Sequence, residues 1–318
     1  MSTSIARAQK LVDERIRGWC SSLPLSDLYA PMAYLMGLGG KRIRPVSLLL
    51  SCELFGGDME QCLDEALGIE LFHNFTLMHD DIMDEAPLRR GRSTVHEKWN
   101  VNTAILSGDA MLVKAYQAMG RDPEVLTLFG RYALKVCEGQ QLDMEFEHRG
   151  SVGLHEHLEM IRLKTAVLLA CAMRIGARLG GASPEDEQRM ADFGEDLGLA
   201  FQLRDDLLDA FGDPRKVGKQ RGGDLRAGKK TYLLISGLEK SLAHGRTELE
   251  VELRKMPAER NVERMIDVLE ELGVAGEVAA VADRRHARAL ASLKEIHVPE
   301  DNKSALLELA ARLLDREH

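Results

Sequence analysis

Residues 72–84 read Phe-His-Asn-Phe-Thr-Leu-Met-His-Asp-Asp-Ile-Met-Asp and end in a cluster of three aspartates. Apolar side chains recur here every three or four positions, which is typical of a largely buried helix. On such a helix Asp80 and Asp84 lie one turn apart on the same face, where like charges destabilise an isolated helix. We therefore expect a cation to lie against this face.

A second cluster with the same spacing, Asp-Asp-Leu-Leu-Asp, occupies residues 205–209. Hard divalent ions such as Mg²⁺ prefer oxygen ligands and usually combine one or two carboxylates with water and substrate phosphates. The repeated cluster therefore indicates a metal site. Two solvated acidic helix faces remain the alternative at this point.

Each aspartate cluster is followed by a basic segment, although the net charge of the chain is −9. Residues 88–92 read Leu-Arg-Arg-Gly-Arg and follow Pro87, where we expect the first helix to end. Residues 212–230 contain seven Lys or Arg, five Gly and two Asp. This arrangement predicts that a substrate phosphate is bound together with metal.

Length and composition favour one large domain over residues 1–318, because no linker or low-complexity tract interrupts the 318 residues. The five cysteines contain no CxxC pair, which favours reduced thiols in a cytoplasmic protein. The longest apolar run, residues 165–173, is far shorter than the roughly 20 residues that span a membrane. The acidic balance argues against nucleic acid as a partner. We expect a soluble, cytoplasmic protein.

Helical periodicity extends along nearly the whole chain, which predicts an all-α fold of long antiparallel helices around a central active-site cavity. Ser183-Pro184-Glu185 is a typical helix start, and Gly-Gly pairs at 56–57 and 180–181 are typical helix ends. The last 75 or so residues are expected to be scaffold. Helices are expected near 5–20, 25–37, 43–55, 58–85, 93–99, 101–120, 122–148, 154–180, 184–211 and 230–241, with several shorter ones to 316.

Both aspartate helices carry a polar stripe among apolar neighbours, and a polar stripe on a buried helix often lines a cavity. The two stripes consist of His73, Thr76, Asp80 and Asp84, and of Gln202, Asp205, Asp206 and Asp209. Taken alone, His73 is more typical of a hydrogen-bonded core histidine than of a ligand.

Basic residues elsewhere are less specific. Lys41 and Arg44 lie in a Gly-rich turn before a helix and are suited to hold a diphosphate, although an ordinary surface turn has the same composition. Lys164 interrupts an apolar run, so it either extends to the surface or reaches an internal anion.

Together these residues resemble the trans-type polyprenyl diphosphate synthase family over about residues 39–234. The two aspartate motifs, the Leu-Arg-Arg-Gly motif at 88–91 and Gly-Lys-Lys-Thr at 228–231 carry the resemblance. It implies the isoprenoid synthase fold, a homodimer, and two aspartate motifs that face each other across a cavity. Tyr232 stands where the family usually has a smaller or apolar residue.

The resemblance also implies roles for individual residues. Three Mg²⁺ ions per active site would be bound, two by Asp80 and Asp84 and the third by Asp205. The remaining motif carboxylates, which ligate or support these ions, are Asp81, Asp206 and Asp209. The residues that would hold the allylic diphosphate are Arg89, Lys164, Lys219 and Lys229. Those that would hold isopentenyl diphosphate are Lys41, Arg44, His73 and Arg90. Thr165 and Gln202 would lie near the developing cation.

The implied reaction is the head-to-tail condensation of isopentenyl diphosphate with a dimethylallyl, geranyl or farnesyl diphosphate after metal-assisted ionisation. Phe75 lies about 7.5 Å from Asp80 along the helix axis and resembles the bulky residue that limits chain length, whereas Thr76 is small. These features favour the C20 product geranylgeranyl diphosphate, with C15 farnesyl diphosphate as the alternative. A class I terpene cyclase and a non-catalytic partner subunit are the rival interpretations.

Overall fold

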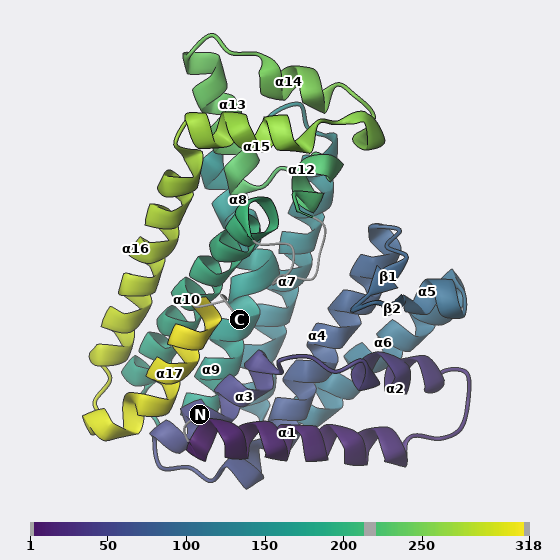
Figure 1. Cartoon of the computed structure of the whole chain (residues 1–318). Helices are drawn as coiled ribbons and strands as arrows, with labels where there is room; N and C mark the ends of the chain where they lie inside the picture. The colour runs from purple at the N-terminus through teal and green to yellow at the C-terminus, as the bar shows by residue number, and fades with distance from the viewer. Residues whose placement is uncertain (1–2, 213–220, 315–318) are drawn as a thin grey trace. The chain divides into compact units, whose positions relative to one another are not determined.

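The computed structural model describes residues 3–212 and 221–314, which are helical almost throughout (Figure 1). The all-α prediction is confirmed. The chain divides into two compact units. Unit 1 consists of residues 1–133, 168–191 and 296–309, and unit 2 of residues 134–167, 192–295 and 310–318. That residues 1–318 act as a single domain stays a prediction.

Unit 1 contains the first aspartate motif and the aromatic residues that precede it. Its elements are α1 (Thr3–Ser22), α2 (Ala30–Gly37), α3 (Ile43–Leu54), a 3₁₀ turn (Met59–Cys62), α4 (Leu63–Met83), β1 (Leu88–Arg89), β2 (Arg92–Ser93), α5 (Val95–Lys98) and α6 (Val101–Met119). It also includes the first part of α7 (Pro123–His148), nearly all of α9 (Val167–Leu179), the first part of α10 (Pro184–Phe211), a 3₁₀ turn (Glu300–Lys303) and most of α17 (Ser304–Leu314).

The core of unit 1 is built around α4, which lies side by side with α6 (Figure 1). Close approach of these two helices requires glycine. A Cβ on Gly68 would meet the Ala115 carbonyl, and one on Gly108 would meet the ring of His79. Most side chains of α3 and many of α4 are buried, so α4 lies in the interior of unit 1. Its polar stripe is therefore part of a fixed helix.

Unit 2 combines the second aspartate motif with the C-terminal helices. Its elements are the remainder of α7 and of α10, then α8 (Leu154–Ile161), a π-helical turn (Arg162–Ala166), α12 (Gly223–Ala227), α13 (Tyr232–Ala243), α14 (Glu248–Leu253), a 3₁₀ turn (Pro257–Glu259), α15 (Val262–Glu271) and α16 (Val274–Lys294).

The core of unit 2 is a cluster of aliphatic residues on α10, α13, α15 and α16, including the buried Leu203, Leu234, Ile266 and Val278. Figure 1 shows α13 crossing close to α15 and α16 in this unit. Leu203 and Ala210 are the residues of the cluster that flank Asp205 to Asp209 on α10.

Helix starts follow the local chemistry expected from the sequence. The Asp186 backbone N–H donates to Ser183 Oγ at 3.2 Å, and Pro184 opens α10. Asn100 caps α6 by accepting from the Thr103 N–H at 2.8 Å. Side-chain caps of this kind contribute about 1 kcal/mol each.

Four helix predictions need correction. The helix expected at 25–37 begins only at Ala30. The helix expected at 58–85 is a 3₁₀ turn followed by α4, which ends at Met83 rather than at Pro87. Glu85 takes a left-handed conformation (φ 48°), and the Ala86 N–H closes the helix on the Asp81 carbonyl. The helix expected at 154–180 is interrupted by the π turn. The C-terminal region includes the 21-residue α16, so its helices are not all short.

Two further features were not expected. β1 and β2 form a two-stranded antiparallel hairpin, with Arg90 and Gly91 both at positive φ in its turn. The thiols of Cys52 and Cys62 are buried 3.1 Å apart. Across the part of the chain that the structure describes, no helix combines the length and apolarity needed to cross a membrane.

Candidate active site

The first aspartate motif lies at the C-terminal end of α4. Asp80 is half-buried, and Asp84 is the exposed C-cap residue, whose N–H donates to the Asp80 carbonyl at 2.8 Å. The helical spacing predicted for these two carboxylates is therefore confirmed at the level of the backbone. Both residues lie at the C-terminal end of α4, a helix that is otherwise largely buried.

Asp81 differs from its two neighbours in the motif, because it is only 3% exposed. Its two carboxylate oxygens accept from Arg89, at 2.8 Å from Nε and 2.7 Å from Nη2. Such a bidentate pair fixes the guanidinium plane. Asp81 thus orients Arg89, the residue expected to bind the allylic diphosphate, instead of presenting free oxygens.

Arg44 and His73 form a contact between α3 and α4, with Arg44 Nη1 3.2 Å from His73 Nε2. Burial and the nearby Arg44, Arg90, Arg89 and Arg42 guanidinium groups hold the pKa of His73 well below its usual value. His73 is therefore neutral, and its Nε2 accepts from Arg44. The buried Arg44 Nε has no hydrogen-bond partner among residues 3–212 and 221–314.

The same segment contains Arg42, a residue whose role the sequence analysis missed. Arg42 is the N-cap of α3 in a left-handed conformation, and its buried guanidinium donates to Glu70 Oε1 and to the Met36 carbonyl, both at 2.5 Å. Asn74 donates to the same Glu70 oxygen at 3.0 Å. Arg42 therefore anchors the Gly-rich turn, and the neighbouring Lys41 is left exposed. The sign of the Arg42–Glu70 pair in the sequence is an acidic residue, Glu70, within an otherwise apolar segment one turn before Asn74.

The second aspartate motif lies in the last turns of α10, where Asp206 is buried. Gln202 Nε2 donates to Asp206 Oδ1 at 3.1 Å, whereas Oδ2 is buried and has no hydrogen-bond partner in the described part of the chain. Burial is the main reason that the pKa of the Asp206 carboxyl rises to about 8; Gln202 and Lys229 oppose this rise.

Asp209 has a structural partner. Its Oδ2 accepts from the Asp224 N–H at 3.0 Å, and its carbonyl accepts from the Gly222 N–H at 2.7 Å. These bonds hold α12 against the end of α10. Asp205 is half-buried on the same motif, one turn before Asp209.

Lys164 lies in the π-helical turn. The sequence left open whether its side chain extends to the surface or reaches an internal anion, and the structure shows it bound to a carboxylate. Its ammonium lies 2.6 Å from Asp143 Oδ2, an ion pair whose side chains are 21% and 13% exposed. Gly139 on α7 permits this approach, because a Cβ there would collide with the backbone of Lys164. π-Helical turns are often found at functional sites. Thr165, the next residue, is half-buried.

The Gly-Lys-Lys-Thr motif connects three helices of unit 2. Gly228 ends α12 at φ 73°, and Thr231 caps α13 by accepting from the Leu234 N–H at 3.3 Å. Lys230 donates to the Phe146 and Arg149 carbonyls at the end of α7. Lys229 is exposed, and its charge acts on Asp206.

The predicted chain-length residues lie in the interior of unit 1. Phe75 is 8% exposed, and its ring lies 4.8 Å from that of His79 and 5.5 Å from that of Phe72. Phe72 stacks edge to face on Phe129 at 5.3 Å. The Thr76 hydroxyl donates to the His73 carbonyl, so it is satisfied within α4.

Some expectations remain untested. Lys219 lies outside the described residues. No group of three or more His, Cys, Asp or Glu within residues 3–212 and 221–314 is arranged to hold a metal ion by itself. The assignments of Asp80, Asp84 and Asp205 to metal therefore remain predictions.

Comparison with known proteins defines the class to which this fold and these sites belong. The family model described as polyprenyl synthetase matches residues 26–271. A short chain isoprenyl diphosphate synthase of Methanothermobacter thermautotrophicus is 38% identical over 99% of this chain and 98% of its own length. A crystal structure of a geranylgeranyl pyrophosphate synthase superposes with a TM-score of 0.93 at 39% identity, covering 100% of both chains. A geranylgeranyl pyrophosphate synthase from Corynebacterium glutamicum, complexed with isoprenyl diphosphate and magnesium, has a TM-score of 0.86 at 28% identity, covering 97% and 98%.

The chain belongs to the polyprenyl synthetase family and has the all-α isoprenoid synthase fold. It is a trans-prenyltransferase of the prenyl diphosphate synthase type. The predicted family, fold class and enzyme class are thus confirmed.

Proposed function

We propose that this enzyme condenses isopentenyl diphosphate head to tail with an allylic diphosphate and releases geranylgeranyl diphosphate. One observation carries the proposal: the Arg44 guanidinium lies 3.2 Å from His73 on the polar stripe of α4, and the charges of Arg90, Arg89 and Arg42 also act on His73. A positive potential of this kind favours an anion, and the Arg44 Nε still lacks a hydrogen-bond acceptor in the described structure.

The isopentenyl diphosphate is bound by Lys41, Arg44, His73 and Arg90 in this proposal. Arg44 approaches from α3 and Arg90 from the β1–β2 turn, and both raise the positive potential at His73. Neutral His73 is a hydrogen-bond partner that adds no further charge. The allylic diphosphate is bound by Arg89, Lys164, Lys219 and Lys229, of which Arg89 and Lys164 are held in place by Asp81 and Asp143.

The residues of the aspartate motifs fit divalent metal. Asp80 and Asp84 are carboxylates one turn apart, and Asp206 has a buried oxygen that lacks a partner among the described residues, a feature that a bound cation would satisfy. We assign Asp80 and Asp84 to two Mg²⁺ ions and Asp205 to a third. Bound metal stabilises the negative charge of the leaving diphosphate.

The chain's own residues then direct the reaction. Arg89 and Lys164 keep hold of the departing diphosphate as its carbon–oxygen bond breaks. Thr165 and Gln202 place polar oxygens near the positive carbon. The double bond of isopentenyl diphosphate forms the new carbon–carbon bond, and the proton lost from its C2 passes to the released diphosphate. Apolar side chains such as Phe75 exclude water from the growing chain.

Product length is set by Phe75 and its aromatic neighbours in this proposal. The Phe75 ring is backed by Phe72, which is backed in turn by Phe129, so that the floor is stiff. A floor five residues before Asp80 together with the small Thr76 favours the C20 product over C15.

We also propose that the chain forms a homodimer through α6. This helix exposes large apolar side chains that a second copy would cover: Val101, Ile105, Leu106, Val113 and Tyr116. Sedimentation velocity should show a dimer that Leu106→Glu converts to a monomer. A wild-type monomer at micromolar concentration contradicts this proposal.

The decisive experiment is incubation of the pure protein with Mg²⁺, isopentenyl diphosphate and each allylic primer, followed by product sizing. Elongated diphosphates of C20 support the proposal, and C15 products assign the alternative length. Released hydrocarbon would indicate a cyclase, and no turnover a non-catalytic subunit. Excess EDTA should abolish turnover, and undiminished activity in EDTA would refute the metal assignment.

A further inference from the structure

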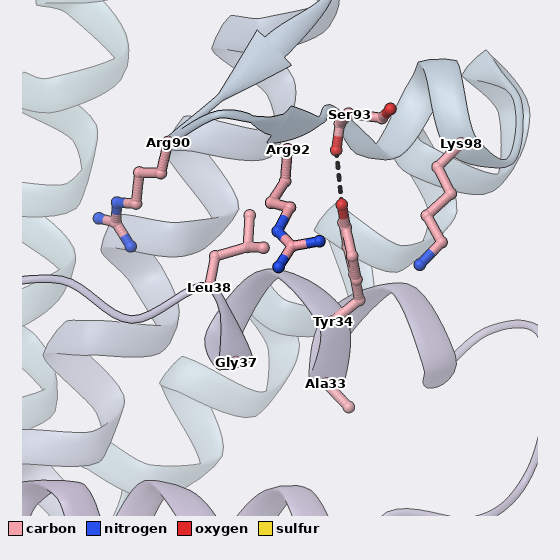
Figure 2. A pocket seen from close by; sticks show the side chains of 8 residues that line it. All are labelled: Ala33, Tyr34, Gly37, Leu38, Arg90, Arg92, Ser93 and Lys98. Atoms are coloured by element: carbon pink, nitrogen blue, oxygen red, sulfur yellow. Dashed lines mark hydrogen bonds between the residues drawn. The ribbon is translucent and has the colours of Figure 1, made fainter. Parts of the chain in front are cut away.

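A basic cavity of about 710 Å³ lies in unit 1, between α2 and the segment that runs from β1 to α5. Three of its lining residues are cationic: Arg90, Arg92 and Lys98. Figure 2 shows Arg92 and Lys98 extending from β2 and α5 toward α2, with Tyr34 rising from α2 between them. The proposed catalytic assignments use Arg90 alone of these residues.

Among the described residues, no carboxylate neutralises the two outer cations of this cavity, Arg92 and Lys98. In the described part of the chain neither Arg92 nor Lys98 forms an ion pair with a carboxylate, and no Asp or Glu lines the cavity. Their neighbour Arg89, by contrast, is paired with Asp81. Like charges that gather in one cavity of a protein with a net charge of −9 indicate an anionic ligand.

The cavity is also pre-organised. The Lys98 ammonium lies 3.7 Å from the centroid of the Tyr34 ring and 4.7 Å from that of Trp99, and these two rings pack edge to face at 5.3 Å. The Tyr34 hydroxyl donates to the Ser93 carbonyl at 2.8 Å, drawn as the dashed line in Figure 2. Tyr34 therefore ties the hairpin to α2 and fixes Lys98.

Arg90 marks the limit of this cavity on the side of the Arg44–His73 contact. It occupies the hairpin turn at φ 52°, and its guanidinium donates to the Gly39 carbonyl. Gly40 has φ 137°, a backbone conformation that favours glycine, and it lies against that guanidinium. Figure 2 shows Arg90 directed away from Arg92, which leaves Arg92 and Lys98 as the cations of the outer cavity.

We propose that this cavity binds the diphosphate group of a small molecule through Arg92 and Lys98, as an anion site separate from the Arg44–His73 contact. The Arg92 fork suits two phosphate oxygens, and the ammonium of Lys98 supplies a second point charge. The cavity opens to solvent at the exposed Arg92 and Lys98, so a substituent beyond the diphosphate can extend outward. Because no carboxylate lines the cavity, binding here does not require metal. The inference goes beyond the proposed function, since it depends on neither aspartate motif.

The test is calorimetric titration of the full-length protein with inorganic pyrophosphate in excess EDTA. Arg92→Gln/Lys98→Gln should lose one binding site or weaken it at least tenfold. Lys10→Gln/Arg17→Gln removes two exposed charges from α1 and should bind like the wild type. Circular dichroism melting checks that each variant is folded, and the single variant Arg92→Gln serves if the double variant is not.

Further variants separate this site from the catalytic one. Arg44→Gln and Asp80→Asn/Asp84→Asn should keep the site that Arg92→Gln/Lys98→Gln removes, even if all of them are inactive. Equal pyrophosphate binding by wild type and Arg92→Gln/Lys98→Gln overturns the proposal. Isopentenyl diphosphate in EDTA should compete with pyrophosphate for the site. Cosedimentation with anionic phospholipid vesicles that depends on Arg92 and Lys98, without pyrophosphate binding, also overturns it in favour of a lipid surface.

Discussion

Arg89 forms a bidentate ion pair with Asp81. Nε lies 2.8 Å from Oδ2, and Nη2 lies 2.7 Å from Oδ1. The Asp81 side chain is 4% exposed, and Arg89 is its one cationic partner among residues 3–212 and 221–314. Removal of the cation leaves a buried charge. Arg89→Ala should therefore lower the free energy of unfolding by about 3 kcal/mol, measured by urea denaturation.

A double-mutant cycle tests the origin of that loss. Asp81→Asn/Arg89→Ala should be less destabilised than the sum of its single variants, because the unpaired charge is gone. The exposed pair of Arg254 and Glu250 is the control and should contribute less than about 1 kcal/mol. Additive effects at Asp81 and Arg89 would contradict this explanation.

A second prediction concerns how Lys164 is positioned. Asp143→Asn removes the charge that holds the Lys164 ammonium at 2.6 Å, so the lysine loses its fixed position in the π-helical turn. We expect kcat/KM for the allylic substrate to fall about ten- to a hundredfold, as misplacement of a positioning group can cost this much. Steady-state kinetics measures the change.

Glu145→Gln is the matched control, because Glu145 lies on the same helix, is exposed, and accepts only from Gln141 within the described hydrogen bonds. It should leave kcat/KM unchanged. Wild-type kinetics in Asp143→Asn would show that Lys164 does not depend on Asp143 for its position.

The sequence predicted the large features of the fold because they rest on local chemistry. The span of α10 follows from Ser183, Pro184 and the acids of its first turn, and matches the expected 184–211. The end of α4 could not be read in the same way. It depends on Glu85 adopting a left-handed conformation, which a residue other than glycine or asparagine does not signal.

The sequence names the charged residues of the candidate site but does not show which of them form pairs. The spacing of Asp80, Asp81 and Asp84 indicated metal, but Asp81 is committed to Arg89 because α4 turns it inward. Lys164 was left with two alternatives, since its partner Asp143 lies on another helix at a sequence distance that no periodicity links. Arg42 and Glu70 were missed for the same reason.

A third prediction addresses product length. Phe75→Ala removes the ring that packs on Phe72 and His79, which opens space beneath the first aspartate motif. The product should become longer than C20, as measured by chromatography of the dephosphorylated alcohols. Since loss of a buried Phe costs about 3–5 kcal/mol, the milder Phe75→Leu provides a folded comparison. Thr76→Ser, which keeps the bond to the His73 carbonyl, should leave product length unchanged. An unchanged product in both Phe75 variants would place the floor elsewhere, for example on α6.

The last prediction uses His157, which is 3% exposed on α8 and lies 6.4 Å, ring to ring, from Tyr232. Burial lowers the pKa of His157 to about 4; Lys229 acts in the same direction and Asp143 opposes both. The unfolded chain binds this proton near pH 6.5, so protonation favours unfolding as the pH falls from about 6.5 toward 4. Stability from this source is therefore complete above pH 6.5 and lost below it.

His157→Gln removes this titration. The free energy of unfolding of the wild type relative to His157→Gln should fall by about 3 kcal/mol between pH 7 and pH 4, at 1.36 kcal/mol per pKa unit. Urea denaturation across this range measures the difference, and His155→Gln, at an exposed position two residues earlier on α8, should follow the wild type. If the two proteins instead lose stability in parallel over this range, the pKa of His157 is not lowered in the folded protein. Burial of His157 then does not control the acid sensitivity of unit 2.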